Sequence, residues 1–156
     1  MKTAIVYASK HGATAEIAQR LASRLGSQAS LFDLATGQPD INDYDTVILG
    51  SGIYAGRKVA QMNKFLETAD LSEKRLGLFI SGMLQAADQR QAELQAAYPA
   101  DLIDQAQASA FLGGRVIMSK LGFAERSIIR LVAKIKSDID TIDNQAIDEF
   151  VEQMSE

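Results

Sequence analysis

The sequence predicts a doubly wound α/β domain, in which helices cover both faces of a five-stranded parallel sheet. Two observations carry this prediction. Short continuous apolar runs, such as residues 4–8, have the composition of strands that are buried on both faces. These runs alternate with segments of helical periodicity, which implies right-handed crossovers between parallel strands. The length of 156 residues suits a single domain that spans residues 1–156.

The elements follow in order along the chain. The predicted strands span residues 4–8, 29–34, 46–49, 76–80 and 108–112, and Gly50 ends the third of them. The predicted helices lie within residues 17–25, 59–69, 86–98 and 147–154. Apolar side chains recur at helical spacing in the first, second and last of these, and the third is rich in the helix-favouring residues Ala and Gln. Residues 35–45 combine Gly, Pro, Asn and Asp, as loops do.

Composition excludes several kinds of chemistry. The chain has no Cys and one His, so it can form no disulfide, thiol nucleophile, iron–sulfur cluster or Cys-based zinc site. We therefore predict no metal site, and the sequence shows no signature of a catalytic side chain. The net charge of −4 argues against nucleic-acid binding. No apolar run approaches the roughly 20 residues of a membrane span, and the N-terminus has the pattern of a strand rather than a signal peptide. We expect a cytoplasmic protein.

Three loops are the candidates for a binding site, because doubly wound sheets bind ligands beyond the carboxyl ends of their strands. They are residues 9–14, 50–57 and 81–86. The first reads SKHGAT and precedes a helix, so free backbone N–H groups and the helix dipole would favour an anion there. Ser9 and Thr14 would add hydroxyl donors. The same residues also suit an ordinary helix cap, and the pattern alone leaves both interpretations open.

Two of these loops carry a family resemblance. YASKHGATAEIA resembles the phosphate loop of flavodoxins. GSGIYAGRKV, after the third strand, is similar to the corresponding loop of a flavodoxin-like subgroup that includes the FMN-dependent, menaquinone-linked protoporphyrinogen IX dehydrogenases of haem biosynthesis. The resemblance implies a flavodoxin-like three-layer sandwich with strand order 2-1-3-4-5, and FMN as the cofactor.

The resemblance also assigns residues to the FMN site. The phosphate loop contributes Ser9, Lys10, His11, Gly12, Ala13 and Thr14. The second loop, which would line the isoalloxazine, contributes Ser51, Gly52, Ile53, Tyr54 and Ala55. The third loop contributes Ser81, Gly82, Met83, Leu84 and Gln85. Tyr54 is the candidate to lie against the ring, with a core or interface position as the alternative. The third loop lacks the aromatic residue that electron-carrier flavodoxins usually place there, so one flavin face would be open or covered by Met83 or Leu84.

A basic segment near the end of the chain stands apart in charge. Residues 115–136 carry a net charge of +5, and the rest of the chain carries −9. Apolar side chains recur there at helical spacing, at Leu121, Ala124, Ile128, Val132 and Ile135. One interpretation is a helix that packs this stripe on the sheet and exposes a solvated basic face. The other is peripheral contact with an anionic membrane surface or an acidic partner.

Two functions follow as hypotheses. The first is an FMN-dependent oxidoreductase of the protoporphyrinogen IX dehydrogenase type, which passes electrons from a reduced small molecule to a quinone at the inner face of the membrane. In that case Arg57 and Lys58 would attract a substrate carboxylate, unless they only begin a solvated helix. The alternative is a small flavodoxin that carries electrons between redox partner proteins. A third hypothesis is a flavodoxin-like scaffold that has lost FMN. The intact residues 9–14 argue against it.

Overall fold

A single parallel sheet forms the centre of the molecule. The computed structural model describes residues 2–54, 57–58, 60–83, 87–132 and 137–156. Its main strands are β1 (Thr3–Ala8), β2 (Ala29–Asp33), β3 (Thr46–Tyr54), β5 (Arg75–Ser81) and β6 (Ala108–Phe111). They pair in parallel in the order β2-β1-β3-β5-β6. Counted along the chain, these five strands have the order 2-1-3-4-5, which confirms the predicted fold.

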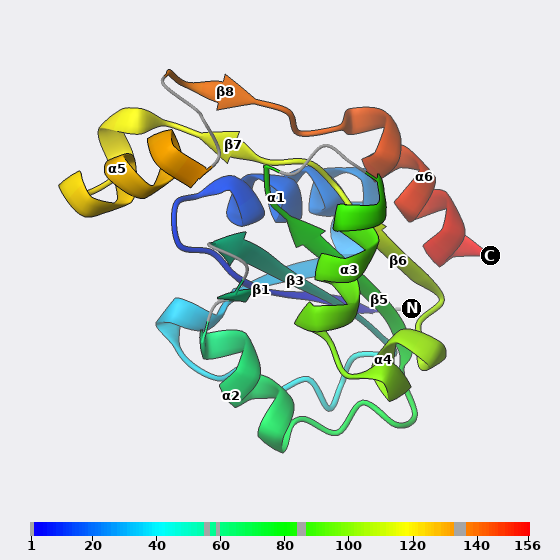
Figure 1. Cartoon of the computed structure of the whole chain (residues 1–156). Helices are drawn as coiled ribbons and strands as arrows, with labels where there is room; N and C mark the ends of the chain where they lie inside the picture. The colour runs from blue at the N-terminus through cyan, green and yellow to red at the C-terminus, as the bar shows by residue number, and fades with distance from the viewer. Residues whose placement is uncertain (1, 55–56, 59, 84–86, 133–136) are drawn as a thin grey trace.

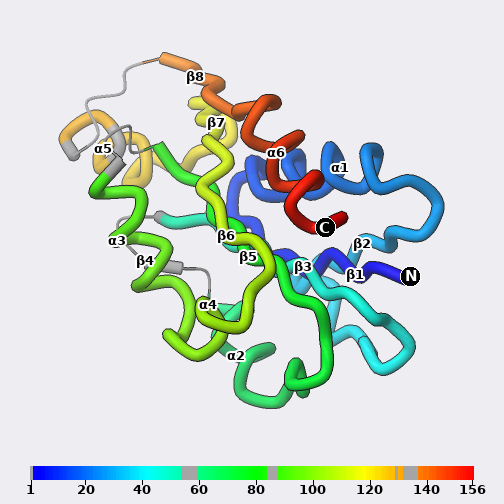
Figure 2. The backbone as a smooth tube through the Cα atoms, turned by 90° about the vertical axis from the view of Figure 1, so that its right-hand side faces the viewer, coloured from blue at the N-terminus to red at the C-terminus, as the bar shows by residue number. Residues whose placement is uncertain are grey.

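Helices cover both faces of the sheet (Figure 1, Figure 2). One face is covered by α1 (Ala13–Leu25) and α6 (Asn144–Ser155), and the other by α2 (Ala60–Thr68), α3 (Ala87–Ala97) and α4 (Ala100–Gln105). Successive strand residues point to opposite faces, so Ile5 packs with α1 and α6 while Val6 packs with α2 and α3. Because side chains on both faces of the sheet are buried, the central strands appear in the sequence as continuous apolar runs.

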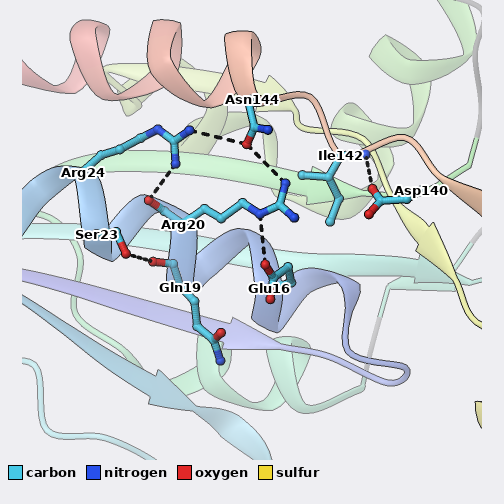
Figure 3. Close-up of polar contacts among 8 residues, drawn as sticks. All are labelled: Glu16, Gln19, Arg20, Ser23, Arg24, Asp140, Ile142 and Asn144. Atoms are coloured by element: carbon cyan, nitrogen blue, oxygen red, sulfur yellow. Dashed lines mark hydrogen bonds and ion pairs between the residues drawn. The ribbon is translucent and has the colours of Figure 1, made fainter.

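The face under α1 and α6 is held by close packing and by polar contacts between the two helices. The ring of Phe79 crosses β3 so closely that a Cβ on Gly50 would lie 2.0 Å from it. Arg20 and Arg24 of α1 both reach the side-chain oxygen of Asn144, at 3.2 and 3.4 Å, as Figure 3 shows. These contacts hold the start of α6 beside α1.

The prediction that the third strand ends at Gly50 is wrong. Strand β3 continues to Tyr54 and turns back into β4 (Arg57–Lys58), with Ile53 opposite Lys58. The extension remains paired with its neighbour, because Gly52 lies in register with Ser81 of β5. Gly50 thus provides space for an aromatic ring rather than a stop signal. Part of the expected loop 50–57 is therefore a strand, and Ser81 likewise belongs to β5.

The basic segment forms a small layer of its own beside the sheet. It contains β7 (Arg115–Val116), the 3-10 turn η3 (Met118–Lys120) and α5 (Phe123–Val132), and β7 pairs antiparallel with β8 (Ile139–Asp140). Leu121 is buried in a satellite cluster with residues that include Val116 and Met83.

Helix α5 departs from the expected packing. It extends away from the sheet (Figure 1), and its side chains Phe123 and Leu131 are 87% and 81% exposed. Of the predicted apolar stripe, Leu121 is buried in the satellite cluster, whereas Ala124 and Ile128 are exposed, so packing of the stripe on the sheet is wrong at these two positions. Among the described residues, no helix is both long enough and apolar enough to cross a membrane.

Candidate functional site

A pocket opens at the carboxyl ends of β1, β3 and β5, and β7 forms its fourth side. It surrounds about 580 Å³ of space that is partly open to solvent. The described residues that line it are Ser9, Lys10, His11, Ala13, Thr14, Gly52, Ile53, Ser81, Gly82, Met83, Gly114, Arg115, Val116 and Leu121. Parts of all three predicted loops therefore meet in one place, as expected for a doubly wound sheet.

Residues 9–14 present an uncapped helix N-terminus to this pocket. Gly12 is the N-cap residue of α1 and has a φ of 95°, a left-handed conformation that glycine adopts without strain. The Gly12 N–H donates to Ser9 Oγ at 3.1 Å, which closes the loop on itself. Gly12 has no side chain, so the N-cap residue itself supplies no capping hydrogen bond to the first turn of α1. Capping by a Ser or Thr at the N-cap position is therefore not seen, and the N–H groups at the start of α1 suit an anion.

Two buried hydroxyls join the first loop to the end of β5. Thr14 Oγ1 and Ser81 Oγ lie 2.7 Å apart, and the residues are only 2% and 3% exposed. Gly52 makes room for this pair, because a Cβ there would lie 3.0 Å from Thr14 Oγ1. Each hydroxyl has one hydrogen to donate, and the bond between them uses one. The other hydrogen remains available to a ligand oxygen.

Apolar side chains also line the pocket. Ile53 and Met83 line it from the sheet side, and Val116 and Leu121 line it from the basic segment. The two sides are joined by backbone, since the Gly82 N–H donates to the Gly113 carbonyl at 3.0 Å. An anion site next to an apolar wall suits a ligand with a charged end and a flat ring.

The basic segment brings its own charges to the first loop. A Cβ on Gly12 would lie 3.9 Å from both Arg115 Nη2 and Lys120 Nζ. Glu125 of α5 contacts His11, and its carboxylate lies 3.8 Å from Lys10 Nζ. Sequence reasoning placed none of the segment in the binding site. Its only signal was the concentration of positive charge between residues 115 and 136.

The remaining predicted site residues lie in different places. Gly12 forms the bend of the first loop. Ser51 is fully buried within β3, donates from Oγ to the Gly52 carbonyl at 3.2 Å and is not among the described residues that line the pocket. The backbone of Tyr54 ends β3. Its side chain, like Ala55, Leu84 and Gln85, lies outside the described residues, so these four assignments stay predictions.

A buried carboxyl lies next to the pocket and was not predicted. Oε2 of Glu93, on α3, lies 3.6 Å from the point that a Cβ on Gly82 would occupy. That oxygen is buried and has no hydrogen-bond partner among the described residues. Burial disfavours the charged form, so the pKa of Glu93 is raised above its usual value.

Comparison with known proteins agrees with this architecture. A flavodoxin from Fusobacterium nucleatum bound to flavin mononucleotide is 20% identical, has a TM-score of 0.57, and is matched over 99% of this chain and 96% of that one. Oxidised flavodoxin 2 from Bacillus cereus is 24% identical with a TM-score of 0.56, over 73% of this chain and 85% of that one. At such identities the likeness shows the fold alone.

Two comparisons rest on sequence. An uncharacterized protein of Methanocaldococcus jannaschii is 35% identical over 81 residues, which are 51% of this chain and 53% of that protein. The match thus spans about half the length of that relative. The sequence model of the flavodoxin domain family matches residues 4–143. The chain therefore belongs to the flavodoxin domain family.

Proposed function

We propose that the protein binds FMN in this pocket and acts as a redox flavoprotein. One observation carries the proposal: an uncapped helix N-terminus and an apolar wall share one pocket at the carboxyl ends of the strands. The phosphate end of FMN matches the first and its isoalloxazine ring matches the second. The bound flavin would supply the electron-transfer chemistry. The side chains of the protein would bind it, orient it and exclude water.

The described residues divide these tasks between them. The backbone N–H groups at the start of α1 and the Thr14–Ser81 hydroxyl pair would hold the phosphate. Ile53 and Met83 would cover part of the ring and keep water from it. We retain the remaining predicted contacts as part of the proposal, namely Lys10, His11, Ser51, Tyr54, Ala55, Leu84 and Gln85.

The more specific proposal is an oxidoreductase of the protoporphyrinogen IX dehydrogenase type that passes electrons to a quinone. Its support is the loop resemblance and the exposed apolar side chains of α5, which lie on the segment that borders the pocket. Contact of this segment with an anionic membrane surface would bring the pocket close to a lipid-phase quinone.

An electron carrier that serves redox partner proteins is supported equally well. A carrier needs only a bound flavin that partners can approach, and the pocket is partly open to solvent. The described residues that line it include no carboxylate. The chemistry would then belong to the flavin alone, without a substrate of the protein's own.

Two measurements test these proposals in turn. The purified protein should show the visible absorption bands of a flavin, or should quench the fluorescence of added FMN. A colourless protein that leaves FMN fluorescence unchanged would contradict flavin binding. For the loaded protein, anaerobic oxidation of protoporphyrinogen IX with menadione as acceptor supports the enzyme. Reduction by a flavodoxin reductase without that turnover supports the carrier.

A further inference from the structure

Two cationic groups of the basic segment face the first loop of the pocket. Arg115 Nη2 and Lys120 Nζ each lie 3.9 Å from the point that a Cβ on Gly12 would occupy. In the described part of the chain neither takes part in an ion pair, since the nearby carboxylate of Glu125 lies against His11 and Lys10. Positive charge from Arg115 and Lys120 thus converges in front of the helix N-terminus, and the ion pairs of the described residues do not include these two cations.

The guanidinium of Arg115 also has an unsatisfied donor. Its Nε is buried and has no hydrogen-bond partner among the described residues. Buried donors are nearly always paired in proteins, because leaving one unpaired costs free energy. Arg115 lines the pocket, so an acceptor bound there could satisfy this donor.

The backbone that carries Arg115 is firmly placed. Arg115 lies in β7 opposite Asp140 of β8, and the preceding Gly114 carbonyl accepts from the Thr141 N–H at 2.7 Å. Val116 and Leu121 are buried on either side of the turn that carries Lys120. The position of Arg115 is therefore set by secondary structure, as expected for a ligand-binding group.

We infer that Arg115 and Lys120 form a cationic cover that binds the phosphate of FMN from the side opposite α1. The inference rests on the proposed function. A phosphate monoester has three terminal oxygens, so it can accept hydrogen bonds from the start of α1 and from a guanidinium at the same time. Riboflavin has the same ring without the phosphate. The cover therefore makes the pocket selective for FMN over riboflavin.

This inference divides the basic segment into two parts. Arg115 and Lys120 act in the pocket, whereas Arg126 and Arg130 lie on α5 and are not among the lining residues. The two cations in the first part of the segment, Arg115 and Lys120, thus serve the cofactor. This role does not depend on whether α5 contacts a membrane.

The test compares two ligands on three variants. Arg115→Gln and Lys120→Gln each remove one cation of the cover, and Arg130→Gln removes the same charge from an exposed position on α5. FMN and riboflavin are titrated by fluorescence quenching. We expect FMN to bind about tenfold more weakly to Arg115→Gln and about threefold more weakly to Lys120→Gln. Riboflavin affinity should stay unchanged in both, and Arg130→Gln should match the wild type for both ligands.

Riboflavin binding shows whether each variant keeps a folded pocket, so the outcomes separate cleanly. Unchanged FMN affinity in both pocket variants would overturn the cover and leave the proposed function standing. Equal loss of both flavins in Arg115→Gln would also overturn it, since the residue would then support the pocket rather than the phosphate. A wild-type protein that binds neither flavin would overturn the proposed function and the cover with it.

Salt dependence gives a second measurement. FMN affinity of the wild type should fall as ionic strength rises, and riboflavin affinity should not. The fall should be smaller in Arg115→Gln, because one of the charges that attract the phosphate is gone. Equal salt dependence for FMN in the wild type and in this variant would count against the cover.

Discussion

At the residue scale, the buried hydroxyl pair of Thr14 and Ser81 links two segments that lie 67 positions apart in the sequence. Thr14→Val keeps the shape of the side chain and removes the hydroxyl. We expect the free energy of unfolding to fall by about 1 kcal/mol, because the buried Ser81 hydroxyl loses its partner. FMN should bind about fivefold more weakly, because the hydroxyl pair that holds a donor in place for the phosphate is broken.

Urea denaturation and FMN titration measure the two effects of Thr14→Val separately. Thr14→Ser keeps the hydroxyl and serves as the control, with affinity near that of the wild type. If Thr14→Val retains full FMN affinity, the hydroxyl only joins the two segments and has no part in the phosphate site.

Glu93 is a second residue with a testable property. Burial raises the pKa of its carboxyl in the folded protein, so the folded state binds this proton more tightly than the unfolded state does. The stability that comes from the protonated form is complete below the unfolded pKa of about 4.5. It is lost as the pH rises from there through the raised folded pKa.

Glu93→Gln tests this assignment, because the amide resembles the protonated acid and does not titrate. We expect the wild type to lose thermal stability relative to Glu93→Gln as the pH rises above about 4.5, because the pKa of Glu93 is raised in the folded protein. Melting temperatures of both proteins across this range measure the difference. A difference that stays constant with pH would mean that the pKa of Glu93 is the same in the folded and unfolded proteins.

At the element scale, α5 combines exposed apolar and basic side chains. Phe123 and Leu131 are largely exposed, and Arg126 and Arg130 lie on the same helix. Such a helix is suited to the interface of an anionic membrane. We predict that the protein sediments with vesicles rich in phosphatidylglycerol at low salt, and that the double substitution Phe123→Ser, Leu131→Ser reduces the bound fraction several-fold.

The matched control for this experiment is Leu31→Ser, which removes an exposed leucine from β2, away from α5. It should bind vesicles as the wild type does. Vesicles of phosphatidylcholine alone should bind less protein, because they lack negative charge. A wild type that stays in the supernatant with anionic vesicles would overturn membrane contact through this helix.

At the scale of the whole molecule, the pocket joins the ends of three central strands to the β7 segment. A ligand that contacts all four of these elements binds the folded state alone and therefore stabilises it. At a free concentration of about 100 times its Kd, FMN should add about 2.7 kcal/mol to the free energy of unfolding. For a chain of this length that corresponds to a rise of about 5 to 10 °C in Tm. Riboflavin at the same concentration should raise Tm less, and no rise with FMN would contradict binding in this pocket.

Much of the fold could be predicted because the evidence for it is local. The apolar run at residues 4–8 marks a strand buried on both faces, and the structure confirms it as β1. The end of β3 could not be predicted in this way. Gly50 resembles a stop signal, but its lack of a side chain serves the ring of Phe79, which comes from the neighbouring strand. That contact depends on sheet register, which no local pattern records.

The sequence by itself determined the alternation of the five main strands with helices, the candidate phosphate loop at residues 9–14 and the family. These depend on periodicity and on residue types within a few positions of each other. Only the tertiary structure decided that Arg115 and Lys120 face that loop, and that Phe123 and Leu131 of α5 stay exposed. The sequence of a charged segment does not specify which part of the molecule it will contact. Its direction is set by the β7–β8 pair and by burial of Val116 and Leu121, which are contacts between distant parts of the chain.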